Sequence, residues 1–301
     1  MDKQQNKTIP PVSKDLLLKV KLLELRTRLQ VRDVFGGKYH SIFKGQGMDF
    51  SEVREYHPGD DIRDIDWNVS ARMDHPYVKV YREERELTVL LVVDLSGSGD
   101  FGTAENLKRE VAAELSALLA MCTLTNNDKV GLILFTDKVE HFVAPKKGRR
   151  HALRIIRDVL AFEPESKGTS IEAGMKFALH AMRKKSVVFL MSDFMCDDYE
   201  KVIRIASRKH DLIAIDFSDP REREIPPSGL IPIRDSETGE IIWFDSSSSK
   251  ARAMFKREAT AMIEQRESFF KRNSIDRIPL SIDKPYFKEL VKFFRMRGRR
   301  T

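Results

Sequence analysis

Three oxygen-bearing side chains directly follow a strongly apolar segment of this chain. Residues 87–93 are mostly aliphatic or β-branched, which is typical of a buried parallel strand. Asp94, Ser96 and Ser98 come next at alternate positions, and a helical pattern starts near Thr103. Mg²⁺ prefers oxygen ligands and takes few of them from protein because it keeps waters. The spacing therefore predicts a cation site at the carboxyl end of the strand, where open α/β sheets bind ligands.

Two later segments carry oxygen ligands in the same position. Thr169 precedes a helical pattern over residues 170–184, and Asp193 follows a second apolar segment, residues 186–191. Because the carboxyl ends of parallel strands lie at one edge of a sheet, we expect the loops to converge. The predicted site then consists of Asp94, Ser96, Ser98, Thr169 and Asp193. The alternative is that these residues only cap the helices that follow them.

This ordered set resembles the metal-ion-dependent adhesion site of von Willebrand factor A-like domains, and all five positions are filled in the expected order. The resemblance implies a bound Mg²⁺, with Mn²⁺ or Ca²⁺ as alternatives, and a partner whose acidic residue completes the coordination shell. Phe194 stands where that family often has Gly, which predicts a crowded site.

Alternating strand and helix patterns predict a doubly wound, mainly parallel sheet with helices on both faces. The expected strands are 87–93, 130–135, 186–191, 212–217 and 278–282, with an edge strand at 139–143 and a hairpin of 231–234 with 240–244. The expected helices are 103–125, 149–161, 170–184, 197–208, 249–271 and 285–294. The predicted α/β domain is 87–297. Two segments precede this domain: a flexible tail, 1–12, and a segment, 13–86, that has a helix near 14–35 and short strands docked on the sheet. A basic tail, 298–301, follows the domain.

Composition narrows the classes of protein that this chain could be. It has 301 residues, 41% of them hydrophobic, which suffices for a core. Lys and Arg number 53 against 46 Asp and Glu, which suggests an acidic partner, a nucleic acid or an anionic membrane surface without choosing between them. Basic clusters lie at 146–150, 183–185 and 295–300; the last lacks the aromatic platform of single-strand binders, and we expect no nucleic-acid ligand.

Two isolated cysteines, Cys122 and Cys196, indicate a reduced protein without a disulfide framework. No apolar run is long enough to span a bilayer, and no signal-peptide core follows the first residues. We therefore expect a cytoplasmic protein without a transmembrane segment.

The segment from His57 to Trp67, together with Asn68, Ala71, Arg72 and residues 77–85, resembles a bacterial family. It is the domain-of-unknown-function family fifty-eight, whose members carry a von Willebrand factor A-like domain. The resemblance covers roughly residues 15 to 297. Members are typically encoded beside MoxR-type AAA+ ATPases, so the resemblance implies an adaptor or co-chaperone of such an ATPase.

The acidic motif within this segment has two interpretations. Its carboxylates, Asp60, Asp61, Asp64 and Asp66, could form a Ca²⁺ loop, although the spacing is not that of an EF-hand. We expect instead a salt-bridged turn in which Arg54, Arg63 or Arg72 pairs with the carboxylates and Trp67 anchors the segment in a groove. On this interpretation the motif residues are structural: His57, Pro58, Gly59, Asp60, Asp61, Arg63, Asp66 and Trp67.

We expect a non-enzymatic, metal-dependent protein-binding module. The first alternative is a hydrolase in which the metal activates water; His57 could act as its base, but no nucleophile motif accompanies it. A nucleic-acid-associated protein is the second alternative. The sequence contains no phosphate-binding loop of the Gly-x-x-x-x-Gly-Lys-Ser/Thr type, so we expect no nucleotide hydrolysis.

Overall fold

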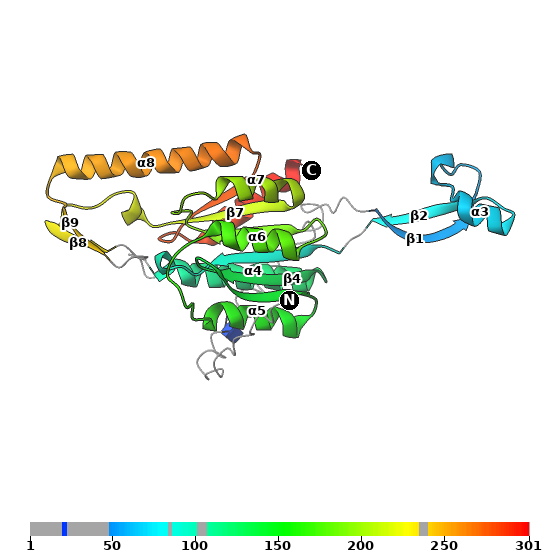
Figure 1. The fold of residues 1–301 in the computed structure, drawn as a ribbon, viewed down its shortest axis with the longest axis horizontal. Coiled ribbons are helices and arrows are strands. Elements are labelled where there is room, and N and C mark those ends of the chain that lie inside the picture. Colours follow the sequence, from blue (N-terminus) through cyan, green and yellow to red (C-terminus); the bar gives the residue numbers. More distant parts are fainter. Residues whose placement is uncertain (1–19, 23–47, 84–85, 101–106, 235–239, 301) are drawn as a thin grey trace. The chain divides into compact units, whose positions relative to one another are not determined.

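A six-stranded sheet forms the centre of the larger part of the protein (Figure 1). The structure is a computed structural model, and it describes residues 20–22, 48–83, 86–100, 107–234 and 240–300. The strand order is β10-β7-β6-β3-β4-β5. All neighbouring strands are parallel except β5, which pairs antiparallel with β4. The strands are β3 (Thr88–Asp94), β4 (Lys129–Phe135), β5 (Val139–Lys146), β6 (Val187–Ser192), β7 (Asp211–Ser218) and β10 (Asp276–Ser281). The predicted α/β class and the edge strand are confirmed.

The register aligns the carboxyl ends of the central strands. Asp94 lies opposite Phe135 of β4, and Ser192 lies opposite Asp216 of β7. Val93 pairs with Met191, so β3 and β6 end at the same level. This alignment brings the residues that follow the two strands to one edge of the sheet.

Helices cover both faces of the sheet, as predicted. They are α4 (Lys108–Thr125), α5 (Arg149–Ala161), α6 (Ile171–Ala181), α7 (Glu200–Lys209), α8 (Ser249–Arg272) and α9 (Tyr286–Arg300). Alternate strand residues such as Leu90 and Val92 pack in one core cluster with Met175 of α6, Ile203 of α7 and Phe270 of α8.

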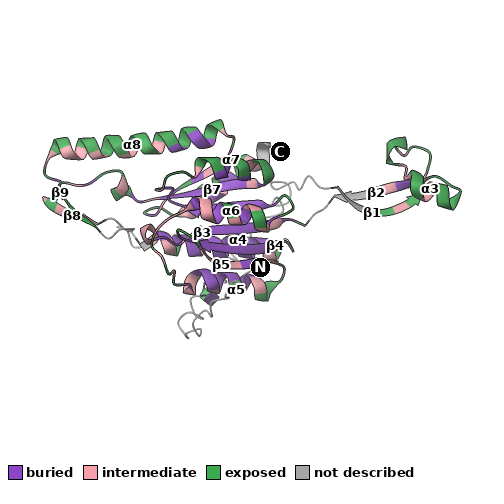
Figure 2. Cartoon of the chain, in the orientation of Figure 1, coloured by how far each residue is buried: buried purple, intermediate pink, exposed green. Residues whose placement is uncertain are grey.

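The opposite face packs against α4 and α9. Ser116 of α4 donates to the sulfur of Met191 at 3.6 Å, and Tyr286 of α9 donates to Glu114 of α4 at 2.7 Å. Helix α4 is buried along most of its length, from Lys108 to Thr123 (Figure 2).

Two helices differ from the prediction. Helix α9 continues to Arg300, so residues 298–300 are helical and do not form a tail. Helix α8 buries only Arg266, Phe269 and Phe270, so only its C-terminal end covers the sheet. Its first four turns are rich in charged residues and leave an exposed surface (Figure 2). The predicted tail, 1–12, and most of the predicted helix near 14–35 lie outside the described residues; residues 20–22 are helical.

Residues 43–87 form a second compact unit. Strands β1 (Met48–Glu55) and β2 (Tyr77–Glu83) pair antiparallel. The 3-10 turn η1 (Ile62–Asp64) and helix α3 (Trp67–Met73) connect them. Gly59 has a φ of 114°, a conformation that side chains disfavour, which explains a glycine in this turn.

No helix in the described ranges combines the length and apolar character that a membrane span requires. Cys122 is buried in α4 and Cys196 is partly exposed; both are free thiols.

One buried histidine connects stability to pH. His210 is 2% exposed, and neither ring nitrogen has a hydrogen-bond partner among the described residues. Burial, with the adjacent charge of Lys209, lowers its pKa to about 4. The unfolded chain therefore binds a proton at higher pH than the folded chain does, and stability falls as pH drops from about 6.5 toward 4.

We expect His210→Leu to remove this pH dependence. Between pH 6.5 and pH 4, the free energy of unfolding of the wild type should fall by up to about 3 kcal/mol more than that of the variant, since one pKa unit corresponds to about 1.4 kcal/mol. Urea unfolding at pH 7 and pH 4.5 measures it. His180→Leu, at an exposed position on α6, is the control and should follow the wild type; a parallel slope in His210→Leu would contradict the assignment.

Candidate metal centre

Asp94, Ser96 and Ser98 lie together at the carboxyl end of β3. Asp94 is the last residue of the strand, and the 3-10 turn η2 (Gly97–Asp100) follows it. The Asp94 Oδ1 atom accepts a hydrogen bond from the Ser96 amide at 2.9 Å, and the hydroxyls of Ser96 and Ser98 are 3.0 Å apart. The turn thus holds one carboxylate and two hydroxyls close together, as predicted.

The loop that carries Thr169 lies beside this turn. The Gly97 amide donates to the Lys167 carbonyl at 2.9 Å, and the Ser170 amide donates to the Thr136 carbonyl at 2.8 Å. Ser170 also caps α6 through the Ala173 amide at 3.2 Å. Thr169 is therefore held between two anchored neighbours at the same edge, and it is partly exposed.

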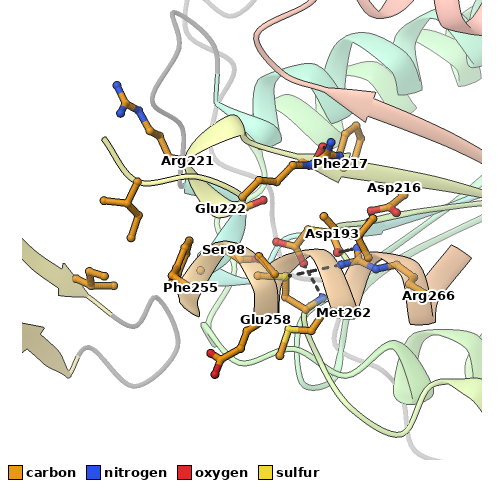
Figure 3. A pocket seen from close by; sticks show the side chains of 18 of the residues that line it. Ser98, Asp193, Asp216, Phe217, Arg221, Glu222, Phe255, Glu258, Met262 and Arg266 are labelled. Carbon is orange, nitrogen blue, oxygen red and sulfur yellow. Dashed lines mark hydrogen bonds and ion pairs between the residues drawn. The ribbon is translucent and has the colours of Figure 1, made fainter. Parts of the chain in front are cut away.

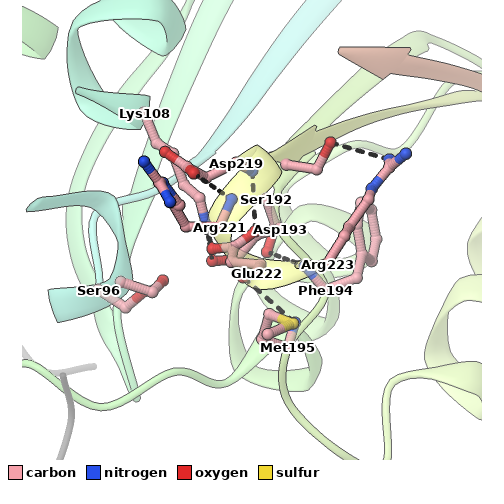
Figure 4. Close-up of polar contacts among 12 residues, drawn as sticks. Ser96, Lys108, Ser192, Asp193, Phe194, Met195, Asp219, Arg221, Glu222 and Arg223 are labelled. Atoms are coloured by element: carbon pink, nitrogen blue, oxygen red, sulfur yellow. Dashed lines mark hydrogen bonds and ion pairs between the residues drawn. The ribbon is translucent and has the colours of Figure 1, made fainter. Parts of the chain in front are cut away.

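Asp193 reaches the same edge from β6, but its carboxylate is already paired. Its Oδ2 atom accepts from the Lys108 ammonium at 2.7 Å, and its Oδ1 atom accepts from the Met195 amide at 3.2 Å. Lys108 also pairs with Glu222 (Figure 4). Both side chains of the Lys108–Asp193 pair are at most 4% exposed. The pair therefore lies out of water, where separating its charges is costly.

Ser192 links the two aspartates. Its hydroxyl donates to Asp94 Oδ2 at 2.6 Å and accepts from the Phe194 amide at 3.1 Å. Burial, followed by the negative charge of Asp193, raises the pKa of Asp94 to about 6. A cation beside Asp94 would oppose both causes.

Lys108 was missed by the sequence analysis. It is the first residue of α4, and a lysine there has no distinguishing motif. Burial disfavours its charge, but the carboxylates of Asp193 and Glu222 outweigh burial and raise the pKa of Lys108. Lys108 is therefore a fixed positive charge next to the predicted site.

A second buried network surrounds the end of β7. Arg266 donates to Asp216 Oδ1 at 2.7 Å and also to the Asp193 carbonyl. Arg277 donates to Asp216 Oδ2 at 2.8 Å. Burial raises the pKa of Asp216 although both guanidinium groups oppose it. Asp94 ends β3, Asp193 directly follows β6, and Asp216 of β7 pairs with Ser192 at the end of β6. Of these three carboxylates, Asp193 and Asp216 form ion pairs with cationic side chains of the protein.

The predicted residues fit a divalent cation in part. Asp94, Ser96 and Ser98 provide the oxygen ligands that Mg²⁺ accepts, and they leave positions for waters or a partner oxygen. Asp193 is held by Lys108, so its carboxylate is not available for direct coordination in this arrangement. Thr169 lies on the adjacent loop. Among the described residues no group of three or more His, Cys, Asp or Glu side chains could hold a metal, so the candidate site depends on its hydroxyls.

Phe194 does not crowd this site. Its side chain is 4% exposed and packs edge-on against Tyr199 and Phe270, with ring centroids 5.5 and 5.3 Å away. Its φ is 54°, in the left-handed region that favours glycine. This conformation explains why a glycine suits the position, and the ring contacts offset the cost of phenylalanine.

The acidic motif at residues 57–67 uses its carboxylates within its own turns. Asp60 accepts two hydrogen bonds from Arg54, at 2.7 and 2.8 Å, and one from the His57 amide at 2.9 Å. Asp61 caps η1 and Asp66 caps α3. The Arg54 guanidinium holds the pKa of Asp60 down, at about 2. These contacts support the structural interpretation of the motif.

Two further residues of the motif are exposed, and the groove contact predicted for Trp67 stays a prediction. Trp67 is 68% exposed, so it does not anchor the core of its own unit. Arg63 is almost fully exposed, with its Nε atom 3.9 Å from Asp61; an exposed pair of this kind contributes little. Arg54 is the arginine that makes the close pair.

Comparison with known proteins identifies the family. Residues 52–265 match the family described as Protein of unknown function DUF58. The chain belongs to this family. Two relatives, the uncharacterized proteins Mb1516 of Mycobacterium bovis and Rv1480 of Mycobacterium tuberculosis, are each 28% identical over 285 residues, covering 93% of this chain and 89% of the relative.

Solved structures show a weaker likeness to this DUF58 chain. The hypothetical protein BatB from Bacteroides thetaiotaomicron has a TM-score of 0.46 at 14% identity, covering 71% of this chain and 99% of that one. An aerotolerance-related membrane protein from Bacteroides fragilis has a TM-score of 0.48 at 15% identity, covering 70% and 99%. The fold assignment therefore depends on the sheet topology described above.

We expect Lys108→Met to destabilise the protein by about 3–5 kcal/mol, because it leaves Asp193 as an uncompensated buried carboxylate. Chemical denaturation at neutral pH measures the change. Lys176→Met is the control, since that lysine forms an exposed pair with Glu172 at 2.9 Å and should change stability by less than about 1 kcal/mol. Equal effects of the two substitutions would show that the buried pair has no special role.

Proposed function

We propose that this protein is a metal-dependent protein-binding module whose cation lies on Asp94, Ser96 and Ser98. One observation carries the proposal. Of the neighbouring carboxylates Asp94, Asp193 and Asp216, the last two form ion pairs: Asp193 with Lys108, and Asp216 with Arg266 and Arg277. Asp94, as far as the described residues show, receives only hydrogen bonds, from Ser96 and Ser192.

An external cation would supply the missing charge. Asp94 would bind it directly, and the hydroxyls of Ser96 and Ser98 would add neutral oxygens. Thr169 would contribute directly or through a water. Asp193, which pairs with Lys108, would attract the cation electrostatically without binding it directly.

The strand order, the site at the carboxyl edge and the Asp-x-Ser-x-Ser spacing support a von Willebrand factor A-like domain with a metal-ion-dependent adhesion site. In such a site an acidic residue of the partner completes the shell of the cation. The DUF58 membership supports a second part of the proposal, that the partner is a MoxR-type AAA+ ATPase and that this chain is its adaptor in the cytoplasm.

We expect Asp94→Asn to weaken Mg²⁺ and Mn²⁺ binding at least tenfold, because the substitution removes the charge and keeps the size of the side chain. Isothermal titration calorimetry measures the affinity. Glu163→Gln removes one exposed carboxylate from the neighbouring loop and should bind both ions as the wild type does. If the two variants bind alike, or if the wild type binds neither ion, the proposal fails. Metal-dependent hydrolase activity that disappears in Asp94→Asn would favour the enzyme alternative.

Removing the charge of Lys108 should have the opposite effect on metal affinity. Lys108→Met should strengthen Mn²⁺ binding several-fold, because Asp193 then becomes available to the cation and no ammonium repels it. Glu222→Gln should weaken binding or leave it unchanged, because Lys108 then depends on Asp193 alone. Titration of Mn²⁺ followed by electron paramagnetic resonance measures both, with folding checked by circular dichroism. Weaker Mn²⁺ binding in folded Lys108→Met would contradict the arrangement.

A further inference from the structure

A large cavity opens beside the candidate metal centre. Its volume is about 1240 Å³, and Ser98 and Asp193 belong to its wall. Most of the remaining wall comes from the end of β7 and the segment after it, from β8 (Leu230–Arg234) and from α8 (Figure 3). Strand β8 forms a hairpin with β9 (Ile241–Asp245). A volume of this size exceeds what a few waters need and lies above the usual range for small-molecule sites.

One part of the cavity wall is formed by apolar side chains. Phe255, Ala259 and Ile263 of α8 line it at intervals of four residues, which places them on one face of the helix. Ile231 and Ile233 line it from the hairpin. The rings of Phe244 and Phe255 are 6.0 Å apart and edge-on, so the hairpin and the helix contact each other across the wall.

Large apolar side chains are also exposed around this cavity. Met262 and Met195, which line it, are 62% and 56% exposed, and Leu230 and Trp243 of the hairpin are 63% and 64% exposed. Exposed large apolar side chains gathered beside a cavity are typical of interaction sites.

The charges near the cavity favour an acidic ligand. Asp193, Asp216 and Glu222, which line it, are paired within the protein with Lys108, Arg266 and Arg277. Lys167, Arg221 and Arg223 also line it, and their side chains are exposed. Glu258 is the exposed acidic residue of the wall. The exposed charge of the lining is therefore positive in sum.

We propose that this cavity binds a segment of a partner protein that combines acidic with large apolar side chains. The apolar side chains occupy the space between α8 and the β8–β9 hairpin. The acidic ones face Lys167, Arg221 and Arg223, and one reaches the end of the cavity at Ser98. Only that last contact rests on the proposed metal-dependent function.

Selection from a phage-displayed library of random dodecapeptides, against the wild-type chain in Mg²⁺, tests the proposal. The recovered peptides should be enriched in Asp or Glu together with aliphatic or aromatic residues. A synthetic fluorescent copy should lose at least tenfold in affinity for Phe255→Asp and for Arg221→Glu, measured by fluorescence anisotropy.

Two matched controls separate the cavity from its surroundings. Met254→Asp changes the neighbour of Phe255 on α8, which is 61% exposed and outside the lining, and Lys250→Glu reverses an exposed charge on the same helix. Both should bind the peptide within about twofold of the wild type. Circular dichroism melts confirm that all variants are folded.

The outcomes distinguish this proposal from the metal proposal. Peptides that bind through Phe255 and Arg221, and that are released by EDTA or by Asp94→Asn, support both. Binding through the same residues that neither treatment affects supports the cavity and contradicts its link to a cation. Failure to recover peptides, recovery of basic peptides, or binding insensitive to Phe255→Asp overturns the cavity proposal, and calorimetry of Mg²⁺ then tests the metal centre by itself.

Discussion

Three like charges at one edge of a parallel sheet are the constraint from which the rest of this structure follows. Strand β6 lies between β3 and β7. Asp94 ends β3, Asp193 follows β6, and Asp216 of β7 pairs with Ser192 at the end of β6. Carboxylates so close together, with little water, cannot all remain charged without cations. Lys108 of α4 compensates the charge of Asp193, and Arg266 of α8 together with Arg277 of β10 compensates that of Asp216.

This compensation also fixes elements around the sheet. Lys108 ties the start of α4 to Asp193 and to Glu222 of the η3 turn (Pro220–Glu222). Arg266 holds the C-terminal half of α8 at the same edge of the sheet. The N-terminal half of α8 extends beyond the sheet and, together with the β8–β9 hairpin, bounds the cavity. The charged network therefore positions both the candidate metal centre and the surface next to it.

The sequence predicts the sheet well because its strands are short, apolar and bounded by polar turns. The six strands of the central sheet and helices α4 to α8 lie close to the predicted ranges, whereas α9 extends beyond its predicted end to Arg300. Asp94, Ser96 and Ser98 could be predicted as neighbours since they follow one strand, and Asp193 since parallel strands end at one edge. The cations could not be predicted, because Lys108 and Arg266 pair with residues 85 and 50 positions away.

The position of a bound ion would show whether Asp94 holds the cation. Crystals soaked in Mn²⁺ and measured at a wavelength with manganese anomalous scattering would locate it. We predict an anomalous peak within about 2.5 Å of an Asp94 oxygen and of the Ser96 or Ser98 hydroxyl, with the ion pair between Lys108 and Asp193 intact. A peak on the acidic motif at residues 57–67, or none beside Asp94 in crystals that hold Mn²⁺ elsewhere, would contradict it.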